Sequence, residues 1–232
     1  MYNILIGAKH ERFIPRSGLI LGEALIRNKL TSKHGLDIGT GESGILAHCL
    51  IAAGVQTVTA VDIKASALHY AKSMDLRAGS ITWIESNIFA KLTVDVLYDI
   101  IVSNPPQMPM RTPGELHDYG GEDGREIILK IIEGCSSFLT TNGQLYILCF
   151  DFLGVDTPYN TRPSLIAIAE SMGFNSIIIS RNQRRVRNHG KTKENIAWIK
   201  EVYPGYVFRE LDDGTLIHDV FVLQLKRVSL VP

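Results

Sequence analysis

The segment LDIGTGESG, residues 36–44, constrains the fold of this 232-residue chain more than any other segment. It places Gly39, Gly41 and Gly44 at G-x-G-x-x-G spacing, after an apolar run and at the start of a helical pattern. Glycines so placed allow a tight turn and let the backbone approach a ligand closely. The pattern predicts a strand, a turn and a helix of a nucleotide-binding α/β sheet, with a tight turn that binds nothing as the alternative interpretation.

Short β-branched and apolar runs alternate with helical patterns along most of the chain. We expect strands within residues 34–41, 57–63, 80–89, 97–104, 144–150, 175–181 and 218–228, and helices within 43–54, 65–79, 124–143, 162–174 and 191–205. This alternation predicts a doubly wound, mainly parallel, seven-stranded α/β sheet with an antiparallel last strand. We expect one domain over residues 1–232, with 1–30 as an N-terminal lead-in and hairpin lid and 181–215 as an inserted basic loop and helix.

Composition narrows the class of protein. Lys+Arg and Asp+Glu number 24 each, so the formal net charge is zero, which disfavours a dedicated nucleic-acid binder. The start shows no signal-peptide pattern and no apolar run is long enough to span a membrane, so we expect a cytoplasmic protein without a membrane partner. Cys49, Cys135 and Cys149 lie far apart in apolar runs, which predicts reduced core thiols. The seven histidines show no ligand spacing, so we expect no metal.

Two carboxylates flank the glycine turn. Asp62 ends the next predicted strand, 23 residues after Gly39, where a carboxylate can accept hydrogen bonds from both ribose hydroxyls. This arrangement fits dinucleotides and S-adenosylmethionine (SAM) alike. Asp37 favours SAM, because a carboxylate attracts the methionine ammonium group but repels a pyrophosphate. Asn87, after the third strand, is a candidate for the adenine edge, with Ile88 covering the ring; a plain turn residue is the alternative for Asn87.

The segment SNPPQMP, residues 103–109, follows the predicted strand YDIIV. Pro105 and Pro106 lack N–H groups and fix φ, and the residue before each proline is pushed toward an extended conformation. The result is a rigid loop that presents carbonyls at the edge where α/β sheets bind ligands. We expect the Asn104 side-chain oxygen and the Pro105 carbonyl to hold a planar amino group in line with a sulfonium methyl group. A stiff strand-ending turn is the alternative.

Taken in order, these segments resemble class I SAM-dependent methyltransferases, and among them the release-factor-type glutamine methyltransferases (HemK-like). The resemblance runs through RFIPR, LDIGTG, VTAVDI, IVSNPPQMP and GGEDGREI and covers most of residues 12–150. It implies a Rossmann-like methyltransferase fold with SAM as the cofactor. The expected cofactor-binding residues are Asp37, Gly39, Thr40, Gly41, Glu42, Ser43, Asp62, Ile63, Asn87, Ile88 and Asn104. The expected catalytic residues are Asn104 and Pro105, and the expected acceptor-binding residues are Arg16, Pro106, Gln107 and Tyr119.

The chain departs from the family pattern in three places that concern the acceptor. The four-residue motif of the family, Asn-Pro-Pro-Tyr, ends in an aromatic side chain that packs against the planar acceptor, whereas Gln107 offers a flat, polar amide. The family follows IPR with an acidic, threonine-containing run, whereas this chain has SGLIL. Only 11 residues precede Arg12, so we expect no N-terminal helical domain of the kind that recognises a release factor. Asn87 also stands where relatives usually carry an acid. We therefore expect SAM binding to be kept and the acceptor to differ from a release factor.

Three further features have both a functional and a plain interpretation. Tyr119, in HDYGGEDGREI, is a candidate aromatic wall on a glycine-hinged loop, although acids at a helix N-terminus explain the same segment. His117 is a candidate general base. The basic stretch RNQRRVRNHGKTK, residues 181–193, is either a clamp for an anionic acceptor or a solvated loop.

The leading hypothesis is methyl transfer from SAM to a nitrogen, amide or amine, of a small molecule or a protein side chain. A second enzyme hypothesis is cyclisation or transfer of the aminobutyrate chain of SAM itself. A third is N-methylation of a nucleic-acid base, which needs an aromatic stacking residue after the prolines. The non-enzymatic alternative is a SAM-binding or scaffold subunit of a heterodimer. As partners of the protein itself, the sequence leaves open a second copy of the chain or a small partner subunit.

Overall fold

The computed structural model describes residues 15–30, 32–75 and 79–228, and these residues form two compact units. In their described parts, the first unit comprises Met1–Asn104, Gly134–Ile147 and Lys226–Pro232, and the second comprises Pro105–Glu133 and Leu148–Leu225. The chain passes from the first unit to the second between Asn104 and Pro105, inside the Asn-Pro-Pro-Gln motif.

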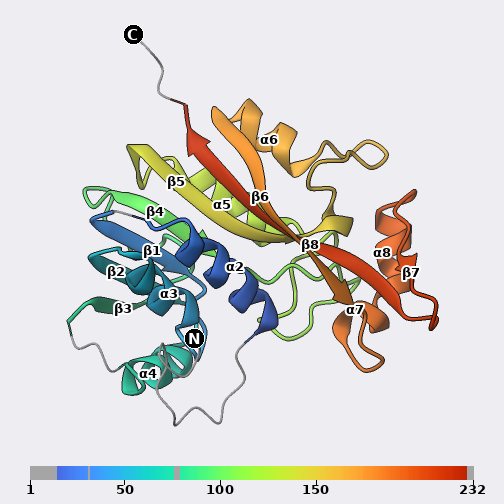
Figure 1. Cartoon of the computed structure of the whole chain (residues 1–232), viewed down its shortest axis with the longest axis horizontal. Coiled ribbons are helices and arrows are strands. Elements are labelled where there is room, and N and C mark those ends of the chain that lie inside the picture. Colours follow the sequence, from blue (N-terminus) through green and yellow to red (C-terminus); the bar gives the residue numbers. More distant parts are fainter. Residues whose placement is uncertain (1–14, 31, 76–78, 229–232) are drawn as a thin grey trace. The chain divides into compact units, whose positions relative to one another are not determined.

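The first unit is built on a parallel sheet. Its elements are α2 (Arg16–Arg27), β1 (His34–Ile38), α3 (Ile45–Ala53), β2 (Thr57–Asp62), α4 (Ala65–Ser73), β3 (Ile81–Glu85), β4 (Tyr98–Ser103) and most of β5 (Leu139–Phe150). The strand order is β3-β2-β1-β4-β5 (Figure 1). Ile38 lies beside Val61 and Ser103, and Asp62 lies beside Glu85, in parallel register. The carboxyl ends of β1 to β4 therefore meet at one edge of the sheet.

Helix α3 is the inner helix of this unit. Its sequence, ILAHCLIAA, is apolar almost all round, and a helix of that kind is stable only when it is covered on several sides. It packs against β1 and β2 on one side and against α2 on the other. The helix ends at Gly54, whose φ of 110° favours glycine. The turn before α3 is thereby anchored to the buried core.

Helix α2 packs very closely against α3. An added Cβ atom at Gly22 would lie 2.6 Å from Cys49 Sγ, and one at Gly18 would lie 3.2 Å from Ile45 Cγ2. Residues four apart share a face of a helix, so these two glycines form the contact stripe of α2. The absence of side chains there lets the two helices approach each other. This packing sets the position of the first turn of α2.

The second unit holds the C-terminal strands and the shorter helices. Its elements are most of α5 (Glu126–Cys135), the end of β5, the 3-10 turn η1 (Asp151–Leu153), α6 (Leu165–Ser171), β6 (Phe174–Arg185), α7 (Lys191–Glu194), α8 (Ile196–Val202), β7 (Arg209–Glu210) and most of β8 (Leu216–Arg227). The strand order continues β5-β8-β6, because β5 belongs to both units, and β7 pairs antiparallel with β8. The arrows of β6 and β8 run in opposite directions in Figure 1.

The predicted fold class is confirmed: a mainly parallel α/β sheet, with seven strands on the main path and an antiparallel last strand. The added strand is the two-residue β7. Several predicted boundaries are wrong. Within the predicted lead-in 1–30, residues 16–27 form α2, and residues 1–14, which hold most of the predicted hairpin, lie outside the described residues. The predicted basic loop begins on β6, which continues to Arg185, and the helix predicted within 191–205 is two short helices, α7 and α8.

The three cysteines are free and buried, as the sequence predicts. Burial raises the pKa of Cys49, Cys135 and Cys149 to about 12 in each case, so these thiols stay protonated at neutral pH. Within the described part of the chain, every helix is too short or too polar to cross a membrane.

Candidate active site

The glycine turn after β1 is held by two carboxylates of the first unit. Gly39 and Gly41 have φ of 73° and 66°, a conformation that side chains rarely adopt. An added Cβ atom at either glycine would meet nothing within 4 Å, so open space lies beside the turn. The backbone N–H of Gly41 donates to Asp62 Oδ2 at 2.9 Å, and that of Lys64 donates to Asp62 Oδ1 at 2.9 Å. Asp62 is half-buried and joins the ends of β1 and β2.

Asp37 is fully buried beneath the same turn. Its Oδ2 accepts a hydrogen bond from Thr40 Oγ1 at 2.6 Å and one from the backbone N–H of Ala47 at 3.0 Å. Its Oδ1 is buried without a partner. Burial raises the pKa of Asp37 from 3.8 to about 7. An orphaned carboxylate oxygen beside a glycine turn is a fitting acceptor for a ligand ammonium group, which would both satisfy it and favour its charged form.

The end of β3 carries a strained residue. Ile88 has φ of 51°, and a β-branched side chain in this region is a genuine outlier that costs of order 1–3 kcal/mol. Ser86 maintains the conformation, because its hydroxyl donates to the Ile88 carbonyl at 3.0 Å and its backbone N–H donates to the Asp62 carbonyl at 2.9 Å. Strain of this kind clusters at ligand sites. Ile63, next to Asp62, is 49% exposed, and Asn87 is exposed.

Asn104 follows β4 at the same sheet edge and is anchored to α2. Its Nδ2 donates to Ser17 Oγ at 3.2 Å. This bond engages the amide nitrogen and leaves Oδ1 as the acceptor atom that the sequence hypothesis requires. The predicted residue Arg16 is exposed at the start of α2. Ser17 and Ser86 have no local sequence signal of their own, and the sequence interpretation missed both.

The loop after Asn104 lies in the second unit and packs on the glycine-rich segment 120–124. The backbone N–H of Met108 donates to the Asp118 carbonyl at 2.9 Å, and that of Gly120 donates to the Met108 carbonyl at 3.1 Å. An added Cβ atom at Gly120 would lie 2.5 Å from Gln107 Cα. Gly120 therefore allows the two backbones to pack closely, and the hinge that the sequence suggests stays a prediction. Tyr119 lies half-buried beside Met108.

Gln107 is 3% exposed, and its side-chain amide hydrogen-bonds to three backbone groups of the second unit. Nε2 donates to the Leu148 carbonyl at 3.0 Å and to the Pro105 carbonyl at 3.3 Å, and Oε1 accepts from the backbone N–H of Phe150 at 2.8 Å. The sequence hypothesis had this amide facing the acceptor. In the structure it hydrogen-bonds to backbone groups at the end of β5 instead.

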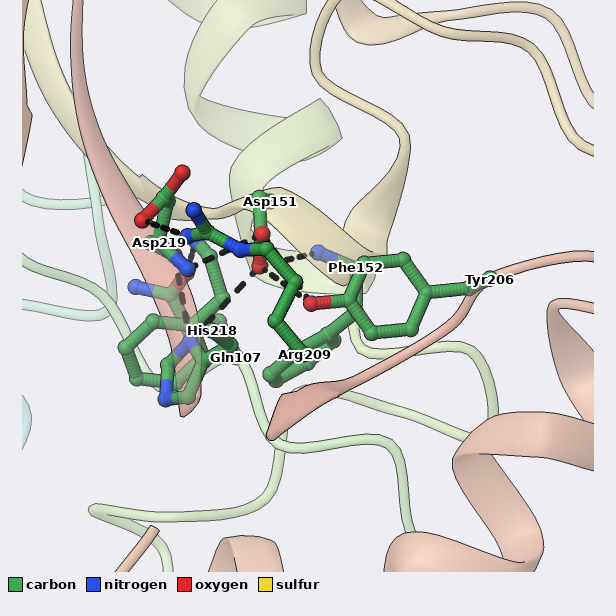
Figure 2. Close-up of polar contacts among 8 residues, drawn as sticks. Gln107, Asp151, Phe152, Tyr206, Arg209, His218 and Asp219 are labelled. Carbon is green, nitrogen blue, oxygen red and sulfur yellow. Dashed lines mark hydrogen bonds and ion pairs between the residues drawn. The ribbon is translucent and has the colours of Figure 1, made fainter. Parts of the chain in front are cut away.

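A polar cluster lies in the same unit, around Asp151 in η1 (Figure 2). The Asp151 carboxylate accepts hydrogen bonds from the backbone N–H groups of Phe152 and Asp219 and from the Tyr206 hydroxyl, at 2.8 to 3.0 Å. Burial, and secondarily Asp151, raises the pKa of the Tyr206 hydroxyl. His218 Nδ1 lies 3.6 Å from Asp151 Oδ1, and its buried Nε2 has no partner. The cluster ties η1 to the segments of β7 and β8.

Three of the six cations in the basic stretch 181–193 pair with acids of the second unit, among them Lys191 with Glu194 at 3.0 Å. Arg181 pairs with Asp156 at 2.7 Å and Arg185 pairs with Asp213 at 3.1 Å. This favours the solvated interpretation over an anion clamp. His117 is exposed and lies 3.5 Å from the neighbouring Asp118. In residues 15–30, 32–75 and 79–228, no three His, Cys, Asp or Glu side chains gather as a metal site.

The parallel sheet, the glycine turn and the acid at the end of β2 are features of the Rossmann-like fold that class I SAM-dependent methyltransferases share. The model of the methyltransferase small domain family matches residues 17–174, more than half of the chain, and so the chain belongs to this family. The cofactor of this class is SAM, and the orphaned Asp37 oxygen and the open space beside Gly39 and Gly41 fit it.

The chain is similar to known glutamine methyltransferases. A release factor glutamine methyltransferase from Rhodopirellula baltica is 30% identical over 168 residues, which cover 63% of this chain and 56% of that protein. A ribosomal protein uL3 glutamine methyltransferase from Bordetella pertussis is 29% identical over 152 residues, covering 58% and 51%. This confirms the predicted resemblance. The chain spans about half to three fifths of the length of the curated relatives it matches.

Among solved structures, the T. thermophilus 16S rRNA N2 G1207 methyltransferase (RsmC), in complex with AdoMet and guanosine, matches with a TM-score of 0.52 and 16% identity. The match covers 95% of this chain and 45% of that one. At this identity the likeness shows the fold alone.

Proposed function

We propose that this protein transfers a methyl group from SAM to the side-chain amide nitrogen of a protein, with glutamine as the first candidate. The observation that carries the proposal is the Asn-Pro-Pro motif directly after β4, whose carboxyl end shares a sheet edge with the glycine turn and Asp62. The choice of glutamine is supported by the named substrates of the relatives, which are glutamine side chains of a release factor and of ribosomal protein uL3.

SAM supplies a methyl group bonded to a positively charged sulfur. In the proposal, Asp37 pairs with the methionine ammonium group and Asp62 accepts hydrogen bonds from the ribose hydroxyls. Asn87 bonds the adenine edge, and Ile63 and Ile88 pack against the ring. Thr40 orients the Asp37 carboxylate through its hydroxyl, and Glu42 and Ser43 complete the turn.

The acceptor amide is held by two consecutive residues. Asn104 Oδ1 and the Pro105 carbonyl, which are consecutive in the chain, accept hydrogen bonds from its two N–H groups, and Pro106 and Tyr119, of the same unit as Pro105, lie beside the acceptor. An amide nitrogen is a poor nucleophile because its lone pair is delocalised, so the contribution of the protein is to fix the direction of attack and exclude water. As the N–C bond forms and the S–C bond breaks, the nitrogen releases one proton.

The decisive experiment supplies methyl-labelled SAM together with matched acceptors. Peptides that contain glutamine, the same peptides with glutamate in its place, and single-stranded and duplex oligonucleotides are each incubated with the protein and analysed by mass spectrometry. The proposal expects one methyl group on glutamine and none on the glutamate peptides. Methylated bases would contradict it, and so would methylthioadenosine formed without any methylated product, because that product comes from aminobutyrate chemistry.

The variant Asn104→Ala tests the acceptor contact separately. We expect turnover to fall by about 100-fold or more, because the acceptor loses one of its two fixed hydrogen bonds, while SAM still binds. Asn175→Ala, at an exposed position on β6, is the matched control and should keep wild-type turnover. Wild-type turnover in Asn104→Ala would contradict the assignment of this side chain.

A further inference from the structure

Gln107 completes the hydrogen bonding of β5 at the point where β4 ends. The last register pair of β4 and β5 is Ser103 with Ile147. In a parallel ladder, a residue that faces Cys149 would donate its N–H to the Leu148 carbonyl and accept from the Phe150 N–H. Those are the two bonds that the Gln107 amide makes. Its side chain therefore substitutes for a backbone peptide.

The prolines explain why a substitute is required. Pro105 and Pro106 have no N–H groups, so the chain that follows β4 cannot donate to β5 at these residues. A buried carbonyl without a donor costs about 1–3 kcal/mol. The orientation of the amide follows from its partners, because the flipped amide would set Nε2 against an N–H group and Oε1 against two carbonyls.

The second N–H of the Gln107 amide bonds to a residue of the Asn-Pro-Pro-Gln motif. Nε2 donates to the Pro105 carbonyl at 3.3 Å, so one amide fixes this carbonyl relative to the end of β5. An aromatic side chain at position 107, as in the four-residue motif of the family, makes no such bonds. Gln107 is also too buried and too fully bonded to provide a stacking surface for a base.

We propose that Gln107 is a positioning residue, whose amide sets the direction of the Pro105 carbonyl by bonding that carbonyl to β5. The catalytic consequence rests on the proposed function, in which the Pro105 carbonyl accepts a hydrogen bond from the acceptor nitrogen. The hydrogen bonds between the Gln107 amide and the Leu148 and Phe150 backbone groups of β5, here called the tether, do not depend on that function.

The variant Gln107→Glu tests the donor role by pH. An ionised glutamate accepts from Phe150 but turns its second oxygen against two carbonyls, whereas a protonated glutamic acid restores one donor. We expect kcat to be about 10- to 100-fold below wild type at about pH 8 and to recover by at least about threefold at about pH 6, since burial raises the pKa of such a carboxyl. The KM for SAM should change by less than about twofold, because the cofactor residues lie in the other unit.

Two controls keep the test decisive. Gln183→Glu makes the same chemical change at an exposed position of β6 and should follow the wild-type pH profile. Gln107→Met fills similar volume without hydrogen bonds and should show the loss of kcat without recovery at low pH. If Gln107→Glu does not fold, Gln107→Met carries the kinetic comparison, and an unchanged kcat overturns the inference. A pH profile of Gln107→Glu parallel to wild type overturns it as well.

Hydrogen exchange separates this inference from the proposed function. The Phe150 N–H donates to Gln107 Oε1, so Gln107→Met should speed its exchange at least about tenfold relative to the Phe152 N–H, which donates to Asp151. Unchanged exchange at Phe150 overturns the tether even in an active enzyme. A wild-type protein that transfers no methyl group overturns the proposed function and the catalytic role, while exchange at Phe150 still decides the tether.

Discussion

Replacing Gly120 by alanine tests the contact between the glycine-rich segment and the Asn-Pro-Pro-Gln loop. The new Cβ atom would lie 2.5 Å from Gln107 Cα, 2.8 Å from the Gln107 carbonyl carbon and 2.8 Å from the Gly124 carbonyl oxygen. Ordinary contacts start near 3.4 Å, so the two backbones must separate by about 1 Å. Overpacking of this kind costs about 1–3 kcal/mol and sometimes more, and backbone atoms cannot turn away as a side chain can.

Urea unfolding and thermal unfolding measure the cost, with Gly190→Ala as the matched control. At Gly190 the nearest atom to an added Cβ lies at 3.4 Å and φ is −155°, so alanine fits without strain. We expect Gly190→Ala to stay within about 0.5 kcal/mol of wild type and Gly120→Ala to lose about 2–4 kcal/mol, a fall in Tm of about 4–16 °C for a chain of this size. Methyl transfer should fall as well, because the loop is displaced. Equal stability of the two variants would refute the argument that the glycine is required by close backbone packing.

Three other predictions follow from buried or ligand-facing charges. The pKa of Asp37 is raised from 3.8 to about 7, so between these pH values the native protein binds more protons than the unfolded chain and loses stability as pH rises. The free energy of unfolding of Asp37→Asn should therefore exceed that of wild type by an amount that grows from near zero at about pH 4 to about 4 kcal/mol at about pH 8. Urea titrations at each pH measure this difference. Asp62→Ala should raise the Kd for SAM about 10-fold or more in calorimetric titration, and unchanged affinity would remove Asp62 from the ribose site. Arg125→Met should lower the free energy of unfolding by about 2–4 kcal/mol, because the buried guanidinium donates to the carbonyls of Leu153, Gly154 and Pro163. Arg111→Met removes an exposed ion pair with Glu201 and a cation–π contact with Trp198 and should cost only about 1 kcal/mol; a similar melting temperature for both variants would contradict this.

The periodicity of the sequence predicted the parallel strands well because each is a short β-branched run bounded by turn residues. It missed α2, because Gly18 and Gly22 weaken the helical pattern when it is judged alone. The cost of those glycines is offset by the close packing on α3, which involves residues about 25 positions away. It also ended β6 too early, because the arginines after Ser180 suggest a loop until their acidic partners, Asp156 and Asp213, are known.

The candidate site likewise contains residues that could be predicted from the sequence and residues that could not. The glycine turn, Asp37 and Asp62 could be found from sequence because their roles depend on residues within one strand-turn-helix unit and the strand that follows. The role of Gln107 could not, because its partners Leu148 and Phe150 are more than 40 positions away and offer backbone atoms, which no side-chain pattern reveals. The strained φ of Ile88 is likewise a property of the folded backbone.

The contact between Gly22 and Cys49 has a consequence for the evolution of this chain. The two positions share one small volume between α2 and α3, so a larger residue at 22 is tolerated only if the residue at 49 becomes smaller. In an alignment of close homologues, positions 22 and 49 should therefore co-vary, with their summed side-chain volume conserved more strongly than either identity. Gly22→Ala alone should be deleterious, and a compensating change of Cys49 to a smaller residue should restore fitness.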